Sequence, residues 1–479
     1  MLRTDQGLGN TVWPWVWTHL PLDGRSGSEI FASLFLDDGI ATLLESPQNS
    51  TLSHSRYSLC AGRPRQRDGD WQIWTPPVGE VFPCLQSLSD RPLSSSLASE
   101  RSLEPPPHLP FWGGWLGWLG YGVSWEIETL PRINPDPLPF PDAYWYEPAQ
   151  FAILDHWTDQ LWLAAANLSE LQQLKMRLQQ DPGPEITSRR SGKSSAIEWI
   201  TSQKEYEAMV QRAQRYIARG DIFQANLSLR FQSKSQLDPW DLYRNLQTLN
   251  PSPFASFWKT PWGGLISCSP ERLVDLRGRQ AQTRPIAGTR PRGESAVQNQ
   301  RWQQDLIQNQ KERAEHIMLV DLERNDLGRV CAWGSVQVNE LLAIESYSHV
   351  MHLVSNVTGQ LRPQCSPIDL IRALFPGGTI TGCPKVRCME IIEELEPVHR
   401  SLFYGSCGYL DIRGQLDLNI LIRTLLYSLP NSLNPAHGSD LQERTIWGQV
   451  GAGIVADSHP EREWHESIQK AQAQLAALG

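Results

Sequence analysis

A polar segment at residues 179–195 divides this sequence into two parts of unequal length. It reads QQDPGPEITSRRSGKSS and mixes Pro, Gly and Ser with charges of both signs, without any hydrophobic period. Such a composition is typical of a linker. Because a chain of 479 residues exceeds what one hydrophobic core usually supports, more than one domain is expected. The sequence therefore predicts domains at residues 1–178 and 197–479, joined by a linker at 179–196.

Beyond the linker, helical and strand patterns alternate. Ser202 and Glu205 form an S-x-x-E capping box at the start of a helical pattern that ends at Gly220. Three segments have the composition and alternation of strands, at residues 221–231, 262–275 and 405–411. Strands of this kind, interrupted by helices, predict an α+β fold with large antiparallel sheets flanked by helices.

The net charge, the apolar runs and the cysteine spacing limit which partners and which cellular compartment the sequence favours. The net charge is −9, which opposes general affinity for nucleic acid and for anionic membranes. No segment approaches the run of about 18 apolar residues that a membrane span needs. The eight Cys residues have no C-x-x-C spacing, as expected for reduced structural thiols. We therefore predict a cytoplasmic protein with no nucleic-acid and no membrane partner, whose anion sites are local pockets.

Residues 282–293, QTRPIAGTRPRG, predict a turn that binds an anion. Pro and Gly around Ala287 let the backbone approach a ligand closely, and Arg284, Arg290 and Arg292 gather positive charge there. The alternative is an exposed basic loop.

Two acidic pairs at helical spacing, about 150 residues apart, suggest a metal site. Glu312 and Glu315 stand at i and i+3, as do Glu463 and Glu466, with Lys470 one turn beyond. If the four carboxylates converged, they would repel by about 4 kcal/mol per close pair, so convergence would require a divalent cation. Mg²⁺ fits such hard oxygen ligands. The alternative is that both pairs lie on solvated helix faces.

Several segments occur in the order found in one enzyme family. They are GDIFQ, SPER, RPIAGT, KERAEHIMLVDLERND, SHVMH, GGTITGCPK, YGSCGYL, LIRT, GAGIVADS and a terminal E-x-x-E-x-x-x-K. From about Ile197 to Gln474 the chain resembles the chorismate-binding domain of anthranilate synthase component I, aminodeoxychorismate synthase component I and isochorismate or salicylate synthases. Residues 43–46, 56–58 and 112–122 resemble the family's N-terminal region less specifically. The resemblance implies the fold of the chorismate-utilising enzymes and chorismate as substrate.

The same resemblance assigns the metal and the acid. It implies that Glu315 and Glu466 are Mg²⁺ ligands, with Glu312 and Glu463 beside them or acting through water. Glu271, in SPER, matches the family's general acid, which protonates the departing 4-hydroxyl. A salt bridge between Glu271 and the next residue, Arg272, is the structural alternative.

Substrate contacts are implied at several further positions. Arg423, Lys470 and the backbone amides from Gly451 to Gly453 match positions that hold the substrate carboxylates. His352 matches the family's active-site histidine. The motifs also place Thr289, Gly382 and Phe403 at the site. Arg423 alternatively has a structural role in a strand.

Gln224 bears on the nucleophile. Water-adding members of the superfamily have a Lys at the matching strand position, because water must be deprotonated before it attacks. Ammonia needs no such base, so Gln224 favours amination over isochorismate or salicylate synthesis. Alternatively, Gln224 only hydrogen-bonds neighbouring backbone.

Ala287 separates the aminating enzymes, although other positions disagree with it. Aminodeoxychorismate synthases have a Lys there that attacks C2; without it, ammonia itself attacks C2 and loss of pyruvate gives anthranilate. Asn226, residues 377–382 and residues 404–410 look more like the aminodeoxychorismate branch, and Phe403 stands where anthranilate synthases usually have Tyr. We give priority to the missing amine and predict anthranilate synthase component I, with aminodeoxychorismate synthase as the alternative.

The remaining predictions concern partners. No glutaminase nucleophile elbow is recognisable, so the resemblance implies a separate glutamine amidotransferase that supplies ammonia.

Five residues resemble the family's tryptophan pocket: Leu44, Glu45, Ser46, Pro253 and Phe254. Tryptophan there is either an inhibitor or structural, and Ala255 in place of a common Met weakens the inhibitory interpretation. A non-catalytic chorismate-binding scaffold is the third hypothesis; it would predict broken acidic pairs or a lost Glu271, and none is broken.

Overall fold

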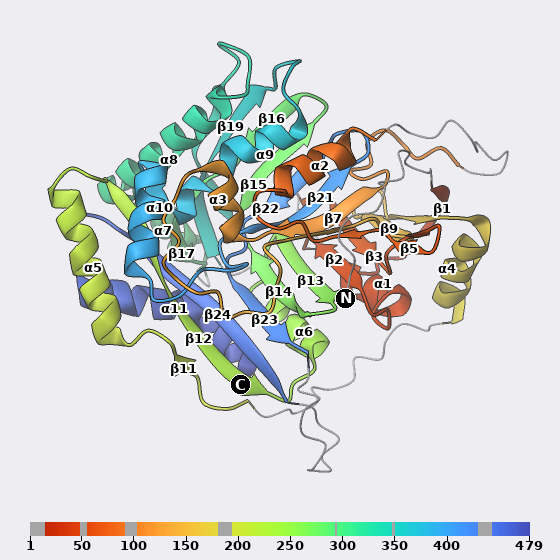
Figure 1. Cartoon of the computed structure of the whole chain (residues 1–479), viewed down its shortest axis with the longest axis horizontal. Coiled ribbons are helices and arrows are strands. Elements are labelled where there is room, and N and C mark those ends of the chain that lie inside the picture. Colours follow the sequence, from red (N-terminus) through yellow and green to blue (C-terminus); the bar gives the residue numbers. More distant parts are fainter. Residues whose placement is uncertain are drawn as a thin grey trace.

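The computed structural model describes residues 15–47, 55–91, 103–180, 194–292, 295–346, 350–429 and 443–479. Within these ranges the strands form two large sheets, of 12 and 10 strands, and one small hairpin of β4 (Gln66–Arg67) and β5 (Asp70–Trp71). Figure 1 shows helices packed around the two large sheets. The fold class is therefore α+β with large antiparallel sheets, as predicted.

The 12-stranded sheet contains strands from both ends of the chain. Its order is β1 (Val16–Pro21), β10 (Gln160–Ala165), β9 (Gln150–Asp155), β3 (Tyr57–Ala61), β2 (Ala41–Glu45), β13 (Phe254–Thr260), β14 (Gly263–Ser269), β23 (Thr424–Ser428), β24 (Arg444–Ile454), β12 (Gln224–Ser235) and β11 (Glu198–Trp199), with β20 (Gly382–Cys383) paired to β12.

The 10-stranded sheet is also built from both parts. Its order is β17 (Ile286–Pro291), β19 (Val350–Gln360), β16 (Gln280–Thr283), β15 (Arg272–Arg277), β22 (Leu416–Asn419), β21 (Ser406–Asp411), β7 (Gly114–Leu119), β8 (Ala143–Tyr146) and β6 (Ile73–Trp74), with β18 (Gln337–Ser346) paired to β19. The two predicted domains thus share both sheets. The division at 179–196 stays a prediction about folding units, and residues 181–193 lie outside the described residues.

Helices contact both sheets. The 12-stranded sheet is contacted by α1 (Gly27–Leu34), α4 (Leu168–Gln180), α5 (Gln203–Ala218), α6 (Pro239–Leu249), α10 (Lys385–Leu395) and α11 (Pro460–Leu478). The 10-stranded sheet is contacted by α7 (Ala296–Gln308), α8 (Gln310–Gly328) and α9 (Pro367–Leu374), with α2 (Val81–Ser89) on α9. Two short elements, η2 (Tyr121–Val123) and α3 (Ser124–Ile127), follow β7.

Apolar side chains from both sheets share one core. Trp118 of β7 and Trp258 of β13 are fully buried, and their rings pack edge to face with centroids 5.8 Å apart. None of the helices in the described residues combines the length and the apolar character that crossing a membrane requires.

The local predictions hold with two changes. The helix predicted from Ser202 is α5, with the predicted capping box formed. The strand expected at 221–231 begins at Gln224 and continues to Ser235.

The prediction of one strand at 262–275 was wrong, because this segment forms two strands in different sheets. β14 ends at Ser269, and β15 begins at Arg272 in the other sheet. Pro270 between them has no N–H to continue a ladder. The chain crosses between the sheets there, through Glu271.

Candidate active site

Gln224 of the 12-stranded sheet meets Glu315, on a helix that packs on the 10-stranded sheet. Gln224 begins β12, and its Nε2 donates a hydrogen bond to Oε1 of Glu315 on α8, at 3.1 Å. Gly453 of β24 lies against both: a Cβ added there would be 2.5 Å from Gln224 Nε2 and 3.3 Å from Glu315 Oε1. The structure therefore brings a predicted nucleophile-selecting residue, a predicted metal ligand and a predicted substrate-binding glycine together. The Gln224 amide bonds this carboxylate through its nitrogen, rather than neighbouring backbone.

Gly382 positions Gln224 from the other side. Its φ is +133°, and an added Cβ would lie 2.1 Å from the Gln224 carbonyl oxygen. Only a residue without a side chain allows β20 to pair this closely with β12.

The segment predicted as an anion-binding turn is mostly strand β17, so that prediction was wrong in form. In the pairing of β17 with β19, Ala287 lies opposite Leu353 and Thr289 lies opposite His352. The register shifts between these two pairs at a bulge that contains Gly288, whose φ is +63°. The bulge keeps the sheet paired while turning the backbone toward α8.

Two of the basic residues of this segment, Arg284 and Arg290, are paired with acids. Arg290 contacts Asp305 at 2.6 Å and Glu312 at 2.8 Å, and Arg284 contacts Glu340 and Glu345. These ion pairs leave less positive charge for a ligand than the sequence suggested. They anchor β17 to α7, α8 and β18.

Glu312 has one oxygen that is not satisfied by the protein. Oε1 accepts the Arg290 bond, whereas Oε2 is buried and accepts no hydrogen bond in the part of the chain that the structure describes. A Cβ at Gly288 would be 2.5 Å from Oε2, so glycine makes room for this carboxylate. A buried carboxylate oxygen in this state suits a cation or a bound water.

A second cluster lies where α11 packs on β24. Lys470 pairs with Glu466 at 2.9 Å and donates to the Gly451 carbonyl oxygen at 3.2 Å. Arg423 precedes β23 with a φ of +52°, and its Nη1 donates to the Lys470 carbonyl oxygen. Arg423 therefore lies in a strained loop position outside the strand, where its guanidinium bonds the backbone of Lys470.

The predicted metal ligands do not form a closed cage. In the described ranges, no group of three or more His, Cys, Asp and Glu side chains is placed to hold a metal ion. Glu315 bonds Gln224, Glu466 is exposed and bonds Lys470, and Glu463 is buried on the same helix. The donors still suit Mg²⁺, which commonly uses one or two carboxylates together with water and substrate oxygens. The unsatisfied oxygen of Glu312 supports that fit.

Glu271 has the environment of a proton donor. It is 5% exposed, and burial together with the charge of Glu323 raises its pKa to about 8, although the Thr379 hydroxyl and the Ile286 N–H oppose the shift. The predicted alternative of a salt bridge with Arg272 is wrong, since Arg272 binds Asp417 through two hydrogen bonds of 2.9 and 2.8 Å. Near neutral pH Glu271 is protonated, as an acid must be.

His352 and Phe403 differ in what surrounds them. Burial, followed by the charge of Arg423, lowers the pKa of His352 to about 4, so it is neutral at pH 7. Phe403 is 1% exposed and lies beneath the Arg230 guanidinium, 5.4 Å from the ring centroid. Phe403 packs in the core, while Arg230 bonds Gln449 and the His399 carbonyl oxygen.

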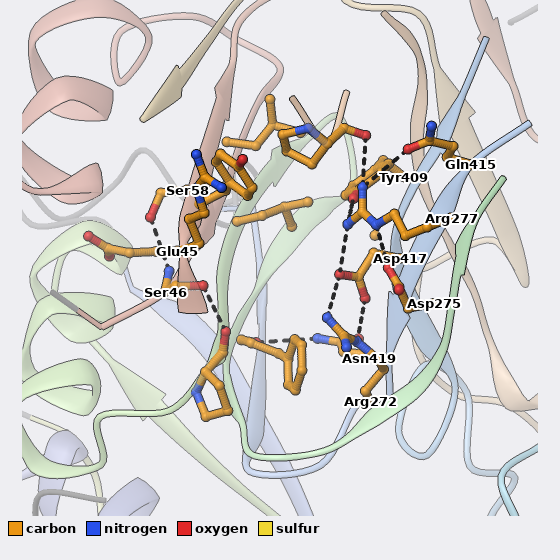
Figure 2. Close-up of a pocket in the computed structure, with 18 of the residues that line it drawn as sticks. Glu45, Ser46, Ser58, Arg272, Asp275, Arg277, Tyr409, Gln415, Asp417 and Asn419 are labelled. Carbon is orange, nitrogen blue, oxygen red and sulfur yellow. Dashed lines mark hydrogen bonds and ion pairs between the residues drawn. The ribbon is translucent and has the colours of Figure 1, made fainter. Parts of the chain in front are cut away.

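A separate cavity of about 480 Å³ lies between the sheets and is lined by all five residues predicted for tryptophan. Figure 2 shows two walls, one with Glu45, Ser46 and Ser58 and the other with a polar network on β15, β21 and β22. Glu45 directs its carboxylate away from the cavity, to Ser28, Tyr243 and Gln247.

The second wall of the cavity is a chain of paired charges. Arg272 pairs with Asp417 at 2.8 Å and stacks over Phe254, with 4.9 Å to the ring centroid. Arg277 pairs with Asp275 at 2.9 Å and donates to the Tyr409 hydroxyl at 2.9 Å. Guanidinium, carboxylate and aromatic groups in one cavity suit a small ligand that carries both charges and an apolar part.

The comparisons decide the family. The family model for a chorismate binding enzyme matches residues 79–476, which includes the clusters around Glu315, Glu271 and Lys470. The chain belongs to the family of chorismate-binding enzymes.

Relatives of this chorismate-binding enzyme have two kinds of name. It is 56% identical to "Anthranilate synthase component I-like protein" of Synechocystis sp., over 97% of this chain and 92% of that protein. It is 43% identical to "Aminodeoxychorismate synthase component 1" of Bacillus subtilis, over 77% of each. The crystal structure of anthranilate synthase component I from Streptococcus pneumoniae superposes with a TM-score of 0.69 and 30% identity, over 89% of this chain and 94% of that one. The chain is a chorismate-utilising enzyme of the anthranilate and aminodeoxychorismate synthase type.

One acidic residue of this chorismate-binding enzyme was missed by the sequence reasoning. Glu323 is 5% exposed and acts on Glu271. Leu319 and Leu327, four residues before and after it on α8, are both buried. A glutamate on the apolar stripe of a helix is a signal that the sequence contained.

Proposed function

We propose that this enzyme aminates chorismate at C2 with loss of the 4-hydroxyl and then eliminates pyruvate, giving anthranilate. Ammonia comes from a separate glutamine amidotransferase. The observation that carries the proposal is the contact between Gln224 and Glu315, which fixes a neutral amide where a water-adding enzyme would need a base. Ala287 supports it, because its methyl group supplies no amine for covalent attack.

In this proposal each residue does one job. Protonated Glu271 gives its proton to the departing 4-hydroxyl, which leaves as water while ammonia forms the C2–N bond. Arg423 and Lys470 hold the substrate carboxylates, and neutral His352 orients a polar group of the ring. Mg²⁺ bound through Glu315 and Glu466, with Glu312 and Glu463 nearby, would supply positive charge at the ring carboxylate.

A second candidate is aminodeoxychorismate synthase component I, which gives the 4-amino product. The 43% identity to the Bacillus subtilis protein of that name favours it, as do Asn226 and residues 377–382 and 404–410. Two of these segments are in contact, since the Asn226 N–H donates to the Thr381 carbonyl oxygen at 2.8 Å.

One experiment separates the candidates. The purified chain is incubated with chorismate, Mg²⁺ and ammonium at alkaline pH, and the product is identified by chromatography and mass spectrometry. Anthranilate supports the first proposal, and 4-aminobenzoate after addition of the lyase supports the second. If chorismate is not consumed while the chain remains folded, the scaffold hypothesis is favoured. Glutamine in place of ammonium tests for the partner, since the chain alone should not use it.

The cavity is the proposed tryptophan site. Its paired charges suit the ammonium and carboxylate of an amino acid, and Tyr57, Pro253 and Phe254 suit an indole ring. Calorimetry with tryptophan, followed by rate measurements at saturation, distinguishes an inhibitor from a structural ligand. Absence of binding would contradict the proposal.

A further inference from the structure

Two side-chain amides at the start of β12 each have an oxygen that accepts no hydrogen bond. Gln224 donates through Nε2 to Glu315 Oε1 at 3.1 Å. Asn226 donates through Nδ2 to the carbonyl oxygen of Thr379, in the short helix η3 (Gly378–Ile380), at 3.3 Å. Because each nitrogen faces an acceptor, these bonds identify which end of each amide is the oxygen. Among the described residues, the buried atoms Gln224 Oε1 and Asn226 Oδ1 have no hydrogen-bond partner.

The two amides lie on the same side of the 12-stranded sheet. Residues two apart on a strand point to the same side, as do residues that lie opposite each other on paired strands. Asn226 lies opposite Gly453 in the pairing of β12 with β24, and a Cβ added at Gly453 would be 2.5 Å from Gln224 Nε2. Glycine at position 453 therefore contributes no side chain to the side of the sheet on which both amides lie.

The chemistry of the two free oxygens favours a small neutral hydrogen-bond donor. A buried acceptor without a donor destabilises the folded chain, so such an atom normally binds a water or a ligand. Ammonia has three N–H groups to donate and one lone pair, and the proposed reaction consumes it. A metal ion would instead favour the nearby carboxylates of Glu312 and Glu315 over two neutral amides.

We propose that Gln224 Oε1 and Asn226 Oδ1 together bind the ammonia molecule that attacks chorismate. The proposal rests on the proposed function and adds Asn226 as a residue that binds the nucleophile. Two N–H groups donate to the two amide oxygens, and the lone pair stays free to form the C2–N bond. The C4–O bond breaks with its electron pair, and the departing oxygen takes the proton of Glu271. The nitrogen gains positive charge in this step, so its hydrogen bonds to both oxygens become stronger.

The test is the KM for ammonia of the Asn226→Val variant, measured at saturating chorismate and Mg²⁺ and expressed as free ammonia. Valine suits a strand but offers no acceptor, so loss of one hydrogen bond should raise this KM by about tenfold. The KM for chorismate should change little. An unchanged KM for ammonia would overturn the proposal. Asn226→Leu replaces Asn226→Val if the latter does not fold.

Asn226→Asp separates the free oxygen from the bond to Thr379. The aspartate keeps an acceptor but loses the Nδ2 donor, so the KM for ammonia should stay within about threefold of the wild-type value. An increase as large as that of Asn226→Val would overturn the proposal, because it would show that Asn226 acts only by holding Thr379.

Gln232 provides a matched control near the other end of the same strand. Its Nε2 donates to Glu198 Oε2 at 2.8 Å. Gln232→Leu removes an amide from β12 and should leave the KM for ammonia unchanged. If this variant raises the KM as much as Asn226→Val does, the proposal is overturned.

The outcomes for this proposal and for the proposed function can be told apart. If the wild-type enzyme makes anthranilate and Asn226→Val has a normal KM for ammonia, only the ammonia site is wrong. If the wild-type enzyme makes the 4-amino product, the proposed function is wrong, and the comparison of KM values still tests the ammonia site. If the wild-type chain uses no ammonia, both proposals are overturned.

Discussion

The cavity between the sheets and the candidate active site differ in how their charged side chains are paired. Around the cavity, Arg272 pairs with Asp417 and Arg277 with Asp275, and Arg56 binds Asp155 through hydrogen bonds of 2.9 and 2.6 Å. At the candidate active site, buried Glu271 and Glu323 form no ion pair within the described residues, although the charge of Lys385 acts on Glu323, and one oxygen of Glu312 accepts no hydrogen bond there.

This difference separates groups that stabilise the fold from groups that serve the reaction. Paired charges are satisfied by the protein itself. Unbalanced carboxyl groups are instead satisfied by protons, cations or substrate, and they lower the stability of the folded chain until these arrive. Replacing a paired residue around the cavity should therefore change the stability of the fold. Replacing a carboxyl group at the candidate active site should instead change the reaction rate.

The largest effect is expected from Glu271→Gln. The variant cannot donate the proton, so kcat should fall by about 10²- to 10⁴-fold, the usual contribution of a general acid. Because Gln cannot ionise in the buried position, the melting temperature at pH 8 should be unchanged or higher. Steady-state kinetics and calorimetry on the same sample measure both. Near-normal kcat, or a large loss of stability, would contradict the division between the regions.

A large change in stability is expected from Asp155→Asn, beside the cavity. Asp155 is buried and Arg56 is partly exposed, so loss of the carboxylate charge should cost about 2 kcal/mol in the free energy of unfolding, as for other hydrogen bonds to charged groups. Burial alone would raise the pKa of Asp155, but its hydrogen bonds from Arg56 and Thr158 outweigh burial and lower it.

That lowered pKa fixes the sign of the pH dependence. The pair stabilises the fold above the ordinary pKa of an aspartate and loses this contribution as pH falls through the lower folded-state pKa. Denaturant unfolding at neutral pH should therefore separate Asp155→Asn from the wild-type protein, and the difference should shrink in acid. A difference independent of pH would show that packing, rather than charge, stabilises this region.

A smaller effect is expected from Glu315→Gln and Glu466→Gln. Each should raise the Mg²⁺ concentration needed for half-maximal rate by at least about tenfold. Replacing a residue that only hydrogen-bonds a metal ligand already weakens metal affinity by about that much, and loss of a ligand should cost no less. The circular dichroism spectrum should be unchanged. Glu461→Gln, at an exposed position on the same helix as Glu466, is the matched control. Equal Mg²⁺ dependence in all variants would remove the metal assignment.

The smallest expected change concerns which product is made. Ala287→Lys places an amine on β17 beside the bulge at Gly288, and we expect a covalent substrate adduct by intact mass or a shift toward the 4-amino product. Loss of rate alone decides nothing, because Lys also adds bulk. Ala287→Met adds similar length without an amine and should give neither outcome. If the unmutated enzyme already makes the 4-amino product, the argument from Ala287 is wrong.

The sequence predicted the parts of this molecule that depend on local pattern or motif order. The α5 helix with its capping box and the acidic pairs on α8 and α11 follow from spacing over a few residues. The resemblance to one family correctly implied the fold. The meeting of Gln224 with Glu315 required the sheet pairing between β12 and β20 and the packing of α8, which no local pattern contains.

Other features were missed because they arise from long-range contacts. Arg290 was expected to bind an anion, but it is held by Asp305 and Glu312. The break at Pro270 was overlooked because the apolar alternation continues through it, although the two halves belong to different sheets. Glu323 was overlooked because the pattern of α8 shows a buried position without showing what it faces.

The strand order has a consequence for how the chain folds during synthesis. Strand β24 (residues 444–454) lies between β23 and β12 and joins the outer strands β12 and β11 to the rest of the 12-stranded sheet. Until the ribosome has made these late residues, Gln224 has no Gly453 beside it, and α11 is not yet present to bring Lys470 to Gly451. A nascent chain therefore carries an unpaired β12 edge until residues 444–454 have been made, and the contacts of Gln224 with Gly453 and of Lys470 with Gly451 form only after that point.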